Sequence, residues 1–454
     1  MKTPVSPPDY GALIKALFDH QDSDLVWRIM SEFSPLDDKG RYLHWDKLRH
    51  LPAPEGLTNE QWWIGVKSSR QKLYQQLPLL DKQRKAFLFC VPDSVQRQLH
   101  WLDRHAAGSI QAEEAITNPQ MRNTYLIRSL VEEAISSSQL EGASTTRHEA
   151  REMIRQQRAP RDKSEQMIFN NYQAMQFIHE NKNEVLTPSI VFELQRIVTD
   201  KTLDDEDVAG RFRDGGGEIH VVDNQSQAIL HTPPPANELE ERLQRLCDFA
   251  NSVNDEENSV FLHPVLKAII LHFMLAYDHP FCDGNGRTAR ALFYWAMANQ
   301  GYWLLEFVSI SKVIKAASVQ YGKAFLYTET DENDVTYFLI HQLGVIHQAI
   351  EALHSYLDKK THDISVTERL LQKNKRLSGK LNFRQLALLR HALKHPRFTY
   401  IVQEHQQSHG ISYDVARKDL SELSDKLKLL VKTKQGKRYL FVVPPDFEQR
   451  INQK

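Results

Sequence analysis

The chain has 454 residues, of which 41% are hydrophobic and 25% are charged, and its formal net charge is −1. This composition is that of a soluble globular protein. The chain is longer than a single hydrophobic core usually accommodates, so we expect two or three domains. The sequence has no run of the roughly 20 apolar residues that cross a membrane and no signal-peptide segment near Met1, so we expect no membrane association and a cytoplasmic location. The three cysteines lie far apart without a CxxC pair, which argues against a disulfide framework and a zinc site.

The first 110 residues predict a helical region that is rich in tryptophan. Patterns typical of helix starts occur at residues 42–48 and 57–63, and we expect their aromatic side chains to form a small core rather than a ligand cage. Helical patterning continues from Phe87 to Ile110. Residues 1–110 are therefore expected to form an N-terminal domain.

The next helix, predicted from Thr124, ends in an unusual way. Its apolar stripe leads into three serines, one of which is Ser137, and then into Glu141 and Gly142. The helix dipole disfavours an acidic side chain at this end. Glu141 is therefore either a solvated surface acid or an acid held by a partner arginine.

A glycine-rich stretch, residues 210–217, precedes a predicted β-hairpin. The two arms are residues 218–223 and 228–232, and Asn224 and Gln225 lie at the turn. An isolated hairpin is only marginally stable in a helical protein. We therefore expect this hairpin to pack beside a site as a lid or a docking edge.

The twelve residues from His279 to Arg290 read HPFCDGNGRTAR and lie between two apolar helical runs. Gly284 and Gly286 permit backbone conformations in which successive N–H groups converge at a helix N-terminus, an arrangement that binds phosphate. Arg287 and Arg290 are three residues apart on the opening turn of the second helix, so both can face one anionic ligand. The turn therefore predicts a phosphate-binding site.

Three other side chains of this turn carry reactive groups. Asp283 offers hard oxygen ligands of the kind that bind Mg²⁺ on a nucleotide. His279 is a candidate general base. Cys282 is a candidate nucleophile, with His279 as its only suggestive neighbour in the sequence.

The C-terminal part differs from the rest of the chain in charge. Residues 364–454 contain 19 Lys and Arg against 8 Asp and Glu, whereas the remaining chain contains 38 basic and 50 acidic residues. We expect a charged linker over residues 359–380, and residues 383–443 predict three helices followed by a hairpin, the order of a winged helix. A basic winged-helix domain is therefore expected at residues 361–454.

The twelve-residue turn matches the signature of the Fic family, HPFx(D/E)GNGRxxR, at every specified position. Residues 210–213 resemble the segment ahead of the family's flap, and residues 232–234 resemble its flap exit. Residues 137–142, SSQLEG, resemble its inhibitory pattern, (S/T)xxxE(G/N). The resemblance covers residues 124–357 and is closest to the class of Fic proteins with an N-terminal inhibitory helix, in a bacterial form with an appended winged helix.

The resemblance implies a mainly α fold. A helical Fic core with a small β-hairpin flap would occupy residues 111–360, and its inhibitory helix would span about 124–142. The helical N-terminal region would precede this core, and the winged helix would follow it.

The resemblance also implies a protein adenylyltransferase, which transfers AMP from ATP to a Ser, Thr or Tyr hydroxyl of a target protein or of itself. His279 would accept the hydroxyl proton, and Asp283 would hold Mg²⁺ on the phosphates. Arg290 would bind the γ-phosphate. The full set of residues expected to bind the nucleotide phosphates is Gly284, Asn285, Gly286, Arg287 and Arg290.

Further roles implied by the resemblance lie outside the turn. Glu141, with Ser137 beside it, would reach Arg290 and neutralise it, which would leave the α-phosphate out of line for attack. The target segment would add to the edge of the flap by main-chain hydrogen bonds. The flap residues expected to dock it are Ile219, His220, Val221 and Leu230.

Three other kinds of site fit the sequence less well. Residues 284–289 formally match a dinucleotide-binding GxGxxA, but they follow a helix rather than a strand. The sequence contains no GxxxxGK(S/T) motif of a P-loop. His391 and His395 have the spacing of zinc ligands but lack the HExxH pattern.

Two other functions are also consistent with the sequence. In the first, the chain is a nucleotide-sensing transcriptional regulator that binds DNA through residues 383–443, although a winged helix can equally serve protein contacts or dimerisation. In the second, Glu141 positions water, and the same site removes AMP from a modified protein. Fic relatives often form dimers, so the resemblance also allows a homodimer.

Overall fold

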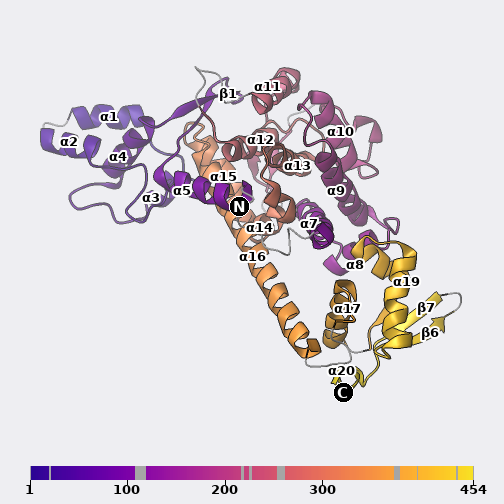
Figure 1. Cartoon of the computed structure of the whole chain (residues 1–454). Coiled ribbons are helices and arrows are strands. Elements are labelled where there is room, and N and C mark those ends of the chain that lie inside the picture. The colour runs from indigo at the N-terminus through magenta and orange to yellow at the C-terminus, as the bar shows by residue number, and fades with distance from the viewer. Residues whose placement is uncertain are drawn as a thin grey trace. The chain divides into compact units, whose positions relative to one another are not determined.

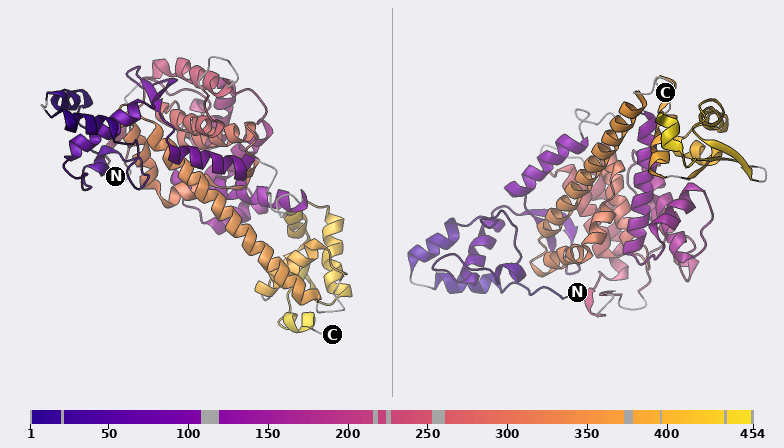
Figure 2. Two further views of the ribbon diagram at one scale, coloured as in Figure 1. Left: turned by 60° about the vertical axis from the view of Figure 1, so that its left-hand side comes forward. Right: turned by 90° about the horizontal axis from the view of Figure 1, so that it is seen from below.

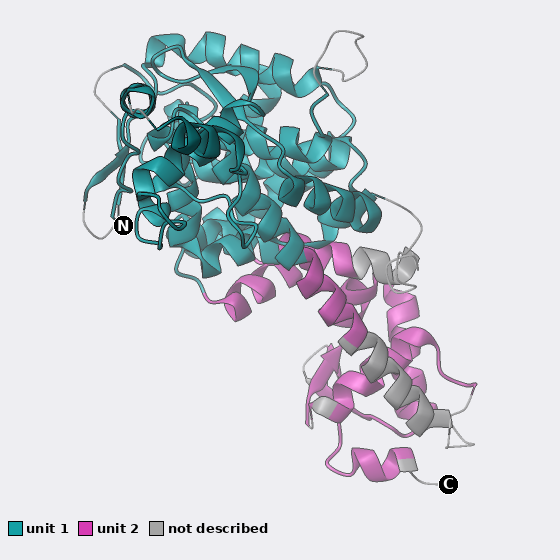
Figure 3. Cartoon of the chain, turned by 90° about the vertical axis from the view of Figure 1, so that its left-hand side faces the viewer, with its two compact units in different colours: residues 1–108, 132–145, 161–349 teal, residues 109–131, 146–160, 350–454 magenta. Residues whose placement is uncertain are grey.

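A computed structural model describes residues 2–19, 22–107, 119–215, 219–223, 227–252, 261–372, 379–395, 397–435 and 438–452. This described part is mainly helical and contains three small antiparallel sheets (Figure 1), which confirms the expected fold class. Across the described ranges, none of the helices is long and apolar enough to traverse a bilayer. The chain divides into two compact units, and each unit is built from three separate segments (Figure 3).

The first unit contains residues 1–108, 132–145 and 161–349, drawn in teal in Figure 3. Its helices are α1 (Tyr10–Phe18), α2 (Ser23–Ser31), α3 (Trp45–Leu48), α4 (Asn59–Gln71), α5 (Asp93–Leu102), α9 (Lys163–Glu180), α10 (Pro188–Thr199), α11 (Leu239–Asn251), α12 (Pro264–Asp278), α13 (Asn285–Asn299), α14 (Ile310–Ala316) and α15 (Ser318–Thr330), with parts of α7 (Pro119–Leu140) and α16 (Thr336–Gln372). Its strands form two hairpins, β1 (Gln75–Leu80) with β2 (Ala86–Phe89) and β3 (Val221–Val222) with β4 (Ile229–His231).

The core of this unit is the helix pair α12 and α13, which pack side by side (Figure 1). The sequence of α12 is apolar on every face, and all of its side chains except Pro264 and Ala276 are buried. Helices α9 and α10 pack on each other and on α13. The turn therefore joins two helices, α12 and α13, that are held in place by the packing around them.

The N-terminal region has the expected tryptophan core, in which Trp45, Trp62 and Trp63 are buried together. It is not helical throughout, however, because Phe87 lies in strand β2 instead of opening a helix as predicted. Phe87 and Phe89 are buried while Leu88 between them is less so, which is the two-residue alternation of a strand. Helical structure in this stretch begins only with α5, and Ile110 lies outside the described residues.

The second unit contains residues 109–131, 146–160 and 350–454, drawn in magenta in Figure 3. Its complete helices and strands are α8 (Arg147–Arg155), α17 (Phe383–Lys394), β5 (Thr399–Ile401), α18 (Val402–His409), α19 (Tyr413–Ser421), β6 (Val431–Gln435), β7 (Arg438–Val442) and α20 (Phe447–Asn452). The strands form one antiparallel sheet in the order β5-β7-β6. Leu389, Leu420 and Phe441, from α17, α19 and β7, lie in its core.

Two expectations for the C-terminal part are wrong. The stretch at residues 359–380 is not simply a linker, because α16 continues to Gln372 as one helix, seen in orange in Figure 2. No glycine or proline interrupts the sequence between Gly344 and the end of this helix. The three helices do not follow one another without a strand, because Tyr400 lies in β5, opposite Phe441 and ahead of α18. The domain limit expected near residue 360 thus falls inside α16.

Candidate active site

The twelve-residue turn joins the end of α12 to the start of α13. α12 ends at Asp278, and His279 follows in the left-handed backbone region with a φ of 46°. Gly284, just before Asn285 at the start of α13, has a φ of 83°. A Cβ on Gly284 would lie 2.8 Å from Cγ2 of Thr199 on α10. Both the backbone angle and the close approach of α10 therefore require glycine at this position.

The side chain of Asn285 holds the turn in shape. Its amide oxygen accepts a hydrogen bond from the backbone N–H of Phe281 at 2.9 Å, and its amide nitrogen donates to the Phe281 carbonyl at 2.8 Å. Phe281 is fully buried and meets the ring of Phe192 on α10. The side-chain amide of Asn285, which was expected to bind phosphate, therefore fixes the shape of the loop.

Two side chains from outside the turn hold its backbone, and neither has a predicted role in the site. Arg213 donates from Nε to the carbonyl of His279 at 2.8 Å, and its backbone N–H donates to the carbonyl of Pro280 at 2.9 Å. Gln195 on α10 donates to the carbonyl of Asp283 at 3.0 Å. The segment around residue 213 is a sequence landmark without an assigned role, and no pattern marks Gln195.

The imidazole of His279 is poised to accept a proton. Its pKa is lowered to about 4, mainly by burial and next by the charge of His231, although a hydrogen bond to the backbone of Ala276 and the charge of Glu141 act in the opposite direction. At neutral pH the ring is therefore uncharged and has a nitrogen lone pair.

Arg290, on the first turns of α13, is paired with the end of α7. Its Nη2 lies 2.8 Å from Oε1 of Glu141 and donates to the Ser137 carbonyl at 3.1 Å. Its Nε donates to the hydroxyl of Ser137 at 2.9 Å. Burial by itself raises the pKa of Glu141, but the charge and hydrogen bond of Arg290 outweigh this effect and hold the pKa below its usual value. Glu141 is therefore the acid held by an arginine, one of the two alternatives that the sequence allows.

Glu141 also occupies the space over the start of α13. A Cβ added to Gly286 would overlap Oε1 of Glu141 and lie 3.1 Å from Nη1 of Arg290. The close approach of the glutamate therefore requires glycine at this position.

Arg287 and Asp283 form a second ion pair of the turn. The side chain of Arg287 is 0% exposed, its Nη1 donates to the carbonyl of Val198 at 2.6 Å, and its Nη2 lies 3.3 Å from Oδ2 of Asp283. The Asp283 side chain is half exposed, and its Oδ1 accepts from the backbone N–H of Gly284 at 2.6 Å. Arg287 therefore braces the turn against α10, while Asp283 presents oxygen atoms to solvent.

The exposed carboxylate of Asp283 fits the binding mode of Mg²⁺ on a nucleotide. Mg²⁺ usually keeps several waters and takes one or two carboxylates together with phosphate oxygens. Within the part of the chain that the structure describes, no three His, Cys, Asp or Glu side chains cluster as a metal site of their own. Phosphate and water would therefore have to supply most of the ligands.

A cavity of about 210 Å³ lies over the turn. Its lining includes predicted site residues from α7, the flap, the turn and α13, namely Glu141, Val221, Leu230, His279, Gly286 and Arg290. An apolar wall comes from α15 through Tyr321, Phe325 and Leu326. The predicted site residues that lie outside this lining are Ser137, Ile219, His220, Asp283, Gly284, Asn285 and Arg287.

The flap strands are shorter than the predicted arms of the hairpin. Val221 on β3 pairs with His231 on β4. Ile219 and His220 lie just before β3 and are half-buried. The hairpin turn, predicted at residues 224–225, lies outside the described residues.

Cys282 does not fit the role of an activated nucleophile. It is a free, exposed cysteine that does not line the cavity. Partial burial of its sulfur and the charge of Asp214 raise the pKa of Cys282, so the thiol stays protonated at neutral pH.

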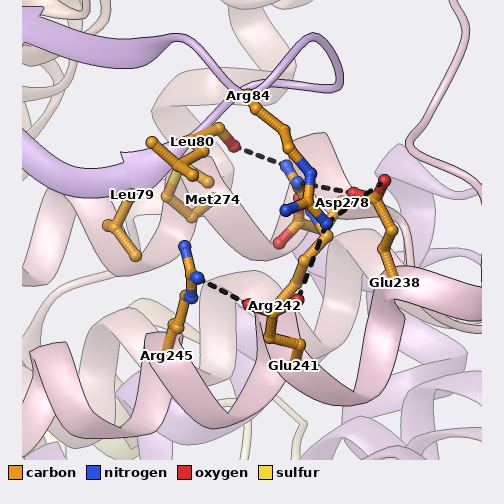
Figure 4. A pocket seen from close by; sticks show the side chains of 9 residues that line it. All are labelled: Leu79, Leu80, Arg84, Glu238, Glu241, Arg242, Arg245, Met274 and Asp278. Atoms are coloured by element: carbon orange, nitrogen blue, oxygen red, sulfur yellow. Dashed lines mark hydrogen bonds and ion pairs between the residues drawn. The ribbon is translucent and has the colours of Figure 1, made fainter.

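The end of α12 is anchored by Arg242 on α11. Arg242 Nε lies 2.9 Å from Oδ1 of Asp278, its Nη1 lies 3.3 Å from Glu238, and its other nitrogen donates to the carbonyl of Leu80 on β1 (Figure 4). Burial raises the pKa of Asp278 to about 6 against the opposing charge of Arg242. This group lies directly before His279, so it helps to fix the position of the base.

Comparison with known proteins shows a family resemblance for part of the chain. The sequence at residues 185–297 matches the model of the Fic/DOC family. The protein adenylyltransferase Fic of Nematostella vectensis is 26% identical over 241 residues, which cover 52% of this chain and 49% of the relative. The protein adenylyltransferase Fic of Drosophila willistoni is 41% identical over 87 residues, which cover 19% of this chain and 16% of that relative.

The chain thus spans about half or less of the length of these curated relatives. Among solved structures, a Fic family protein from Desulfovibrio desulfuricans covers 77% of this chain and 95% of its own, at 17% identity and a TM-score of 0.48. Residues 185–297, which run from α10 through the flap to α13, are therefore a Fic/DOC family domain.

Proposed function

We propose that this chain is a protein adenylyltransferase, which transfers AMP from ATP to a hydroxyl side chain of a protein, and that Glu141 restrains it. One observation carries the proposal: a single cavity brings together the neutral base His279, the buried cation Arg290 and the carboxylate of Glu141, with the flap at its wall. The names of the similar proteins support this reaction.

The start of α13 is suited to the phosphates of ATP, because backbone N–H groups and the helix dipole there attract anions. The acceptor oxygen would attack the α-phosphorus and form the new P–O bond. The bond between this phosphorus and the oxygen that bridges to the β-phosphorus would break, and pyrophosphate would leave. His279 would take the hydroxyl proton on a ring nitrogen, which its low pKa keeps free at neutral pH.

Asp283 would hold Mg²⁺ through the oxygen atoms that it presents to solvent. The ion, when bound, would neutralise negative charge on the phosphates. Arg287 would then act mainly by holding Asp283 and the turn, since its own side chain is buried and bonded to Val198.

Glu141 would restrain the reaction by competing for Arg290. Arg290 is buried, and its Nη2 already donates to the Glu141 carboxylate and to the Ser137 carbonyl. An arginine paired in this way cannot give the same bonds to a γ-phosphate, and in-line placement of the phosphates supplies most of the rate in such reactions.

The test is self-labelling with ATP that carries its label on the α-phosphate. Glu141→Gly should increase incorporation on the order of tenfold or more over wild type, because correct phosphate placement is worth at least that factor. His279→Ala in the same Glu141→Gly background is the matched control, and it should abolish incorporation while nucleotide binding persists. Equal or lower labelling of Glu141→Gly than of wild type would exclude the restraint.

The opposite reaction is tested with the same two proteins. If Glu141 positions water for removal of AMP, wild type should release AMP from previously labelled protein and Glu141→Gly should not. Incubation in cell extract with labelled ATP, CTP and GTP would then identify the target protein and the preferred nucleotide.

The flap would dock the target segment through main-chain hydrogen bonds along a strand edge. Val221 and Leu230 line the cavity, whereas Ile219 and His220 lie ahead of β3. A docking mode of this kind places few demands on the target sequence, because the backbone supplies most of the contacts.

A second function, DNA binding, is favoured by the exposed face of α19. Arg417 and Lys418 are exposed on this helix beside Tyr413 and Val415, which are 44% and 38% exposed. The three helices and the sheet order β5-β7-β6 agree with a winged helix, in which such a helix enters the major groove. The two functions are compatible within one chain.

A further inference from the structure

His231, the last residue of flap strand β4, is held between two oxygen atoms. It is 8% exposed. Its Nδ1 lies 2.8 Å from Oε2 of Glu329, and its Nε2 lies 2.7 Å from the backbone oxygen of Tyr277. Its ring also packs on the ring of Tyr277, with centroids 4.6 Å apart. Both ring nitrogens therefore face groups that only accept hydrogen bonds.

Each of these contacts ties the ring to a different element. Nδ1 meets the carboxylate of Glu329 on α15, and Nε2 meets the backbone of α12, in a site that is nearly closed to water.

Both oxygen partners of His231 lie at helix C-termini. The Tyr277 carbonyl is one of the last four of α12, which lack a partner within the helix. Glu329 lies in the last turn of α15, where the helix dipole disfavours an acid. His231 contacts both ends, so one side chain joins the flap, the end of α12 and the end of α15.

We propose that His231 and Glu329 are a positioning pair that fixes flap strand β4 against the end of α12 and thereby sets where the acceptor segment lies relative to His279. Leu230, the neighbour of His231 on β4, lines the cavity, and His279 follows Tyr277 by two residues. The effect on the acceptor rests on the proposed adenylyl transfer. The tether itself does not depend on that reaction.

The surroundings of His231 support this role. Asp278 and His279 both respond to its charge, and Asp278 is already paired with Arg242. The charge of His231 is one of the causes that lower the pKa of His279. Loss of His231 should therefore both loosen the flap and raise the pKa of the base.

The first test needs no activity. Hydrogen exchange, followed by mass spectrometry, is measured on peptides that cover residues 219–232 in wild type, His231→Gln and Glu329→Gln. We expect faster exchange of the flap in both variants, and no change in His50→Gln, which alters an exposed histidine on the N-terminal region. Unchanged flap exchange in both variants would overturn the proposal, and Glu329→Gln still decides the matter if His231→Gln fails to fold.

The second test observes the contacts of the ring directly. With ¹⁵N-labelled histidine, the wild-type chain should show a hydrogen-bonded ring N–H signal that disappears in His231→Gln. A spectrum in which no such signal depends on His231 would contradict the tether.

The third test uses self-labelling in the Glu141→Gly background. His231→Gln should lower the maximal rate on the order of fivefold through misplacement of the acceptor, while the half-saturating ATP concentration stays the same. It should also move the rise of the rate to higher pH, an effect that structural damage alone would not produce. If Glu141→Gly itself does not label, the proposed function fails, whereas a change in flap exchange would still support the tether.

Discussion

His279 is a histidine whose surroundings remove its charge. Burial and the nearby charge of His231 lower its pKa to about 4, while its hydrogen bond to Ala276 and the charge of Glu141 oppose the shift. A base acts in its deprotonated form, so its contribution is lost only as the pH falls through the pKa. The acid limb of transfer should therefore lie well below neutral pH.

We predict that the self-labelling rate of Glu141→Gly changes little between pH 7 and pH 5. A base with a pKa near 4 is still about 90% deprotonated at pH 5, whereas an ordinary histidine is only about 3% deprotonated there. ATP binding measured at both pH values controls for titration of the nucleotide. A tenfold or larger fall in the self-labelling rate, without loss of ATP binding, would show that His279 is not buried as it is in the structure.

The other residues of the site differ in whether the sequence alone identifies them. Arg290 could be recognised from its spacing in the motif, but its partner Glu141 lies 149 residues earlier in the chain. Arg213 belongs to a sequence landmark without an assigned role, and no pattern marks Gln195. Their roles arise because distant segments place them against the backbone of the turn. Such contacts can be found only when the fold is known.

Helix α7 is fixed to the core by a buried carboxylate in addition to Glu141. Glu133 is 1% exposed. Its Oε2 accepts from the hydroxyl of Tyr294 at 2.9 Å, from the hydroxyl of Ser309 at 2.7 Å and from the backbone N–H of Ser311 at 3.1 Å. The helix that carries the restraining glutamate is thus tied to α13 and α14 eight residues before Glu141.

We predict that Glu133→Gln lowers the free energy of unfolding by about 1–3 kcal/mol, because an amide nitrogen cannot accept from these donors and leaves buried groups unpaired. Chemical denaturation measures the change, and Glu180→Gln, an exposed glutamate at the end of α9, is the control. In self-labelling, Glu133→Gln should also increase incorporation, although less than Glu141→Gly. A variant as stable as wild type would show that α7 is held mainly by its apolar face.

At the scale of the whole molecule, the two compact units are interleaved along the chain. α7 and α16 each contribute residues to both units, and the segment with Glu141 lies in the chain between two segments of the second unit. Covalent continuity therefore links the restraining glutamate to the unit that contains the basic C-terminal residues.

We predict that the full chain binds duplex DNA with an affinity that falls linearly, on logarithmic scales, as salt rises. Lys434→Glu and Arg438→Glu, which change exposed positions on β6 and β7, should weaken binding and reduce the salt slope by about one for each lost phosphate contact. Lys39→Glu, at an exposed position of the N-terminal region, is the control. Binding that does not respond to salt would argue for protein contacts in place of DNA.

Local periodicity and a contiguous motif are enough to predict the mainly α class, the place of the turn at His279–Arg290 and the family of the domain. The three-dimensional contacts were needed to show that Glu141 meets Arg290, that Asn285 and Arg287 hold the turn, and that His231 joins the flap to α12. They also showed that Phe87 belongs to a strand and that α16 continues to Gln372. These features depend on which distant side chains are buried together, and burial sets both the partners of a charged group and its pKa.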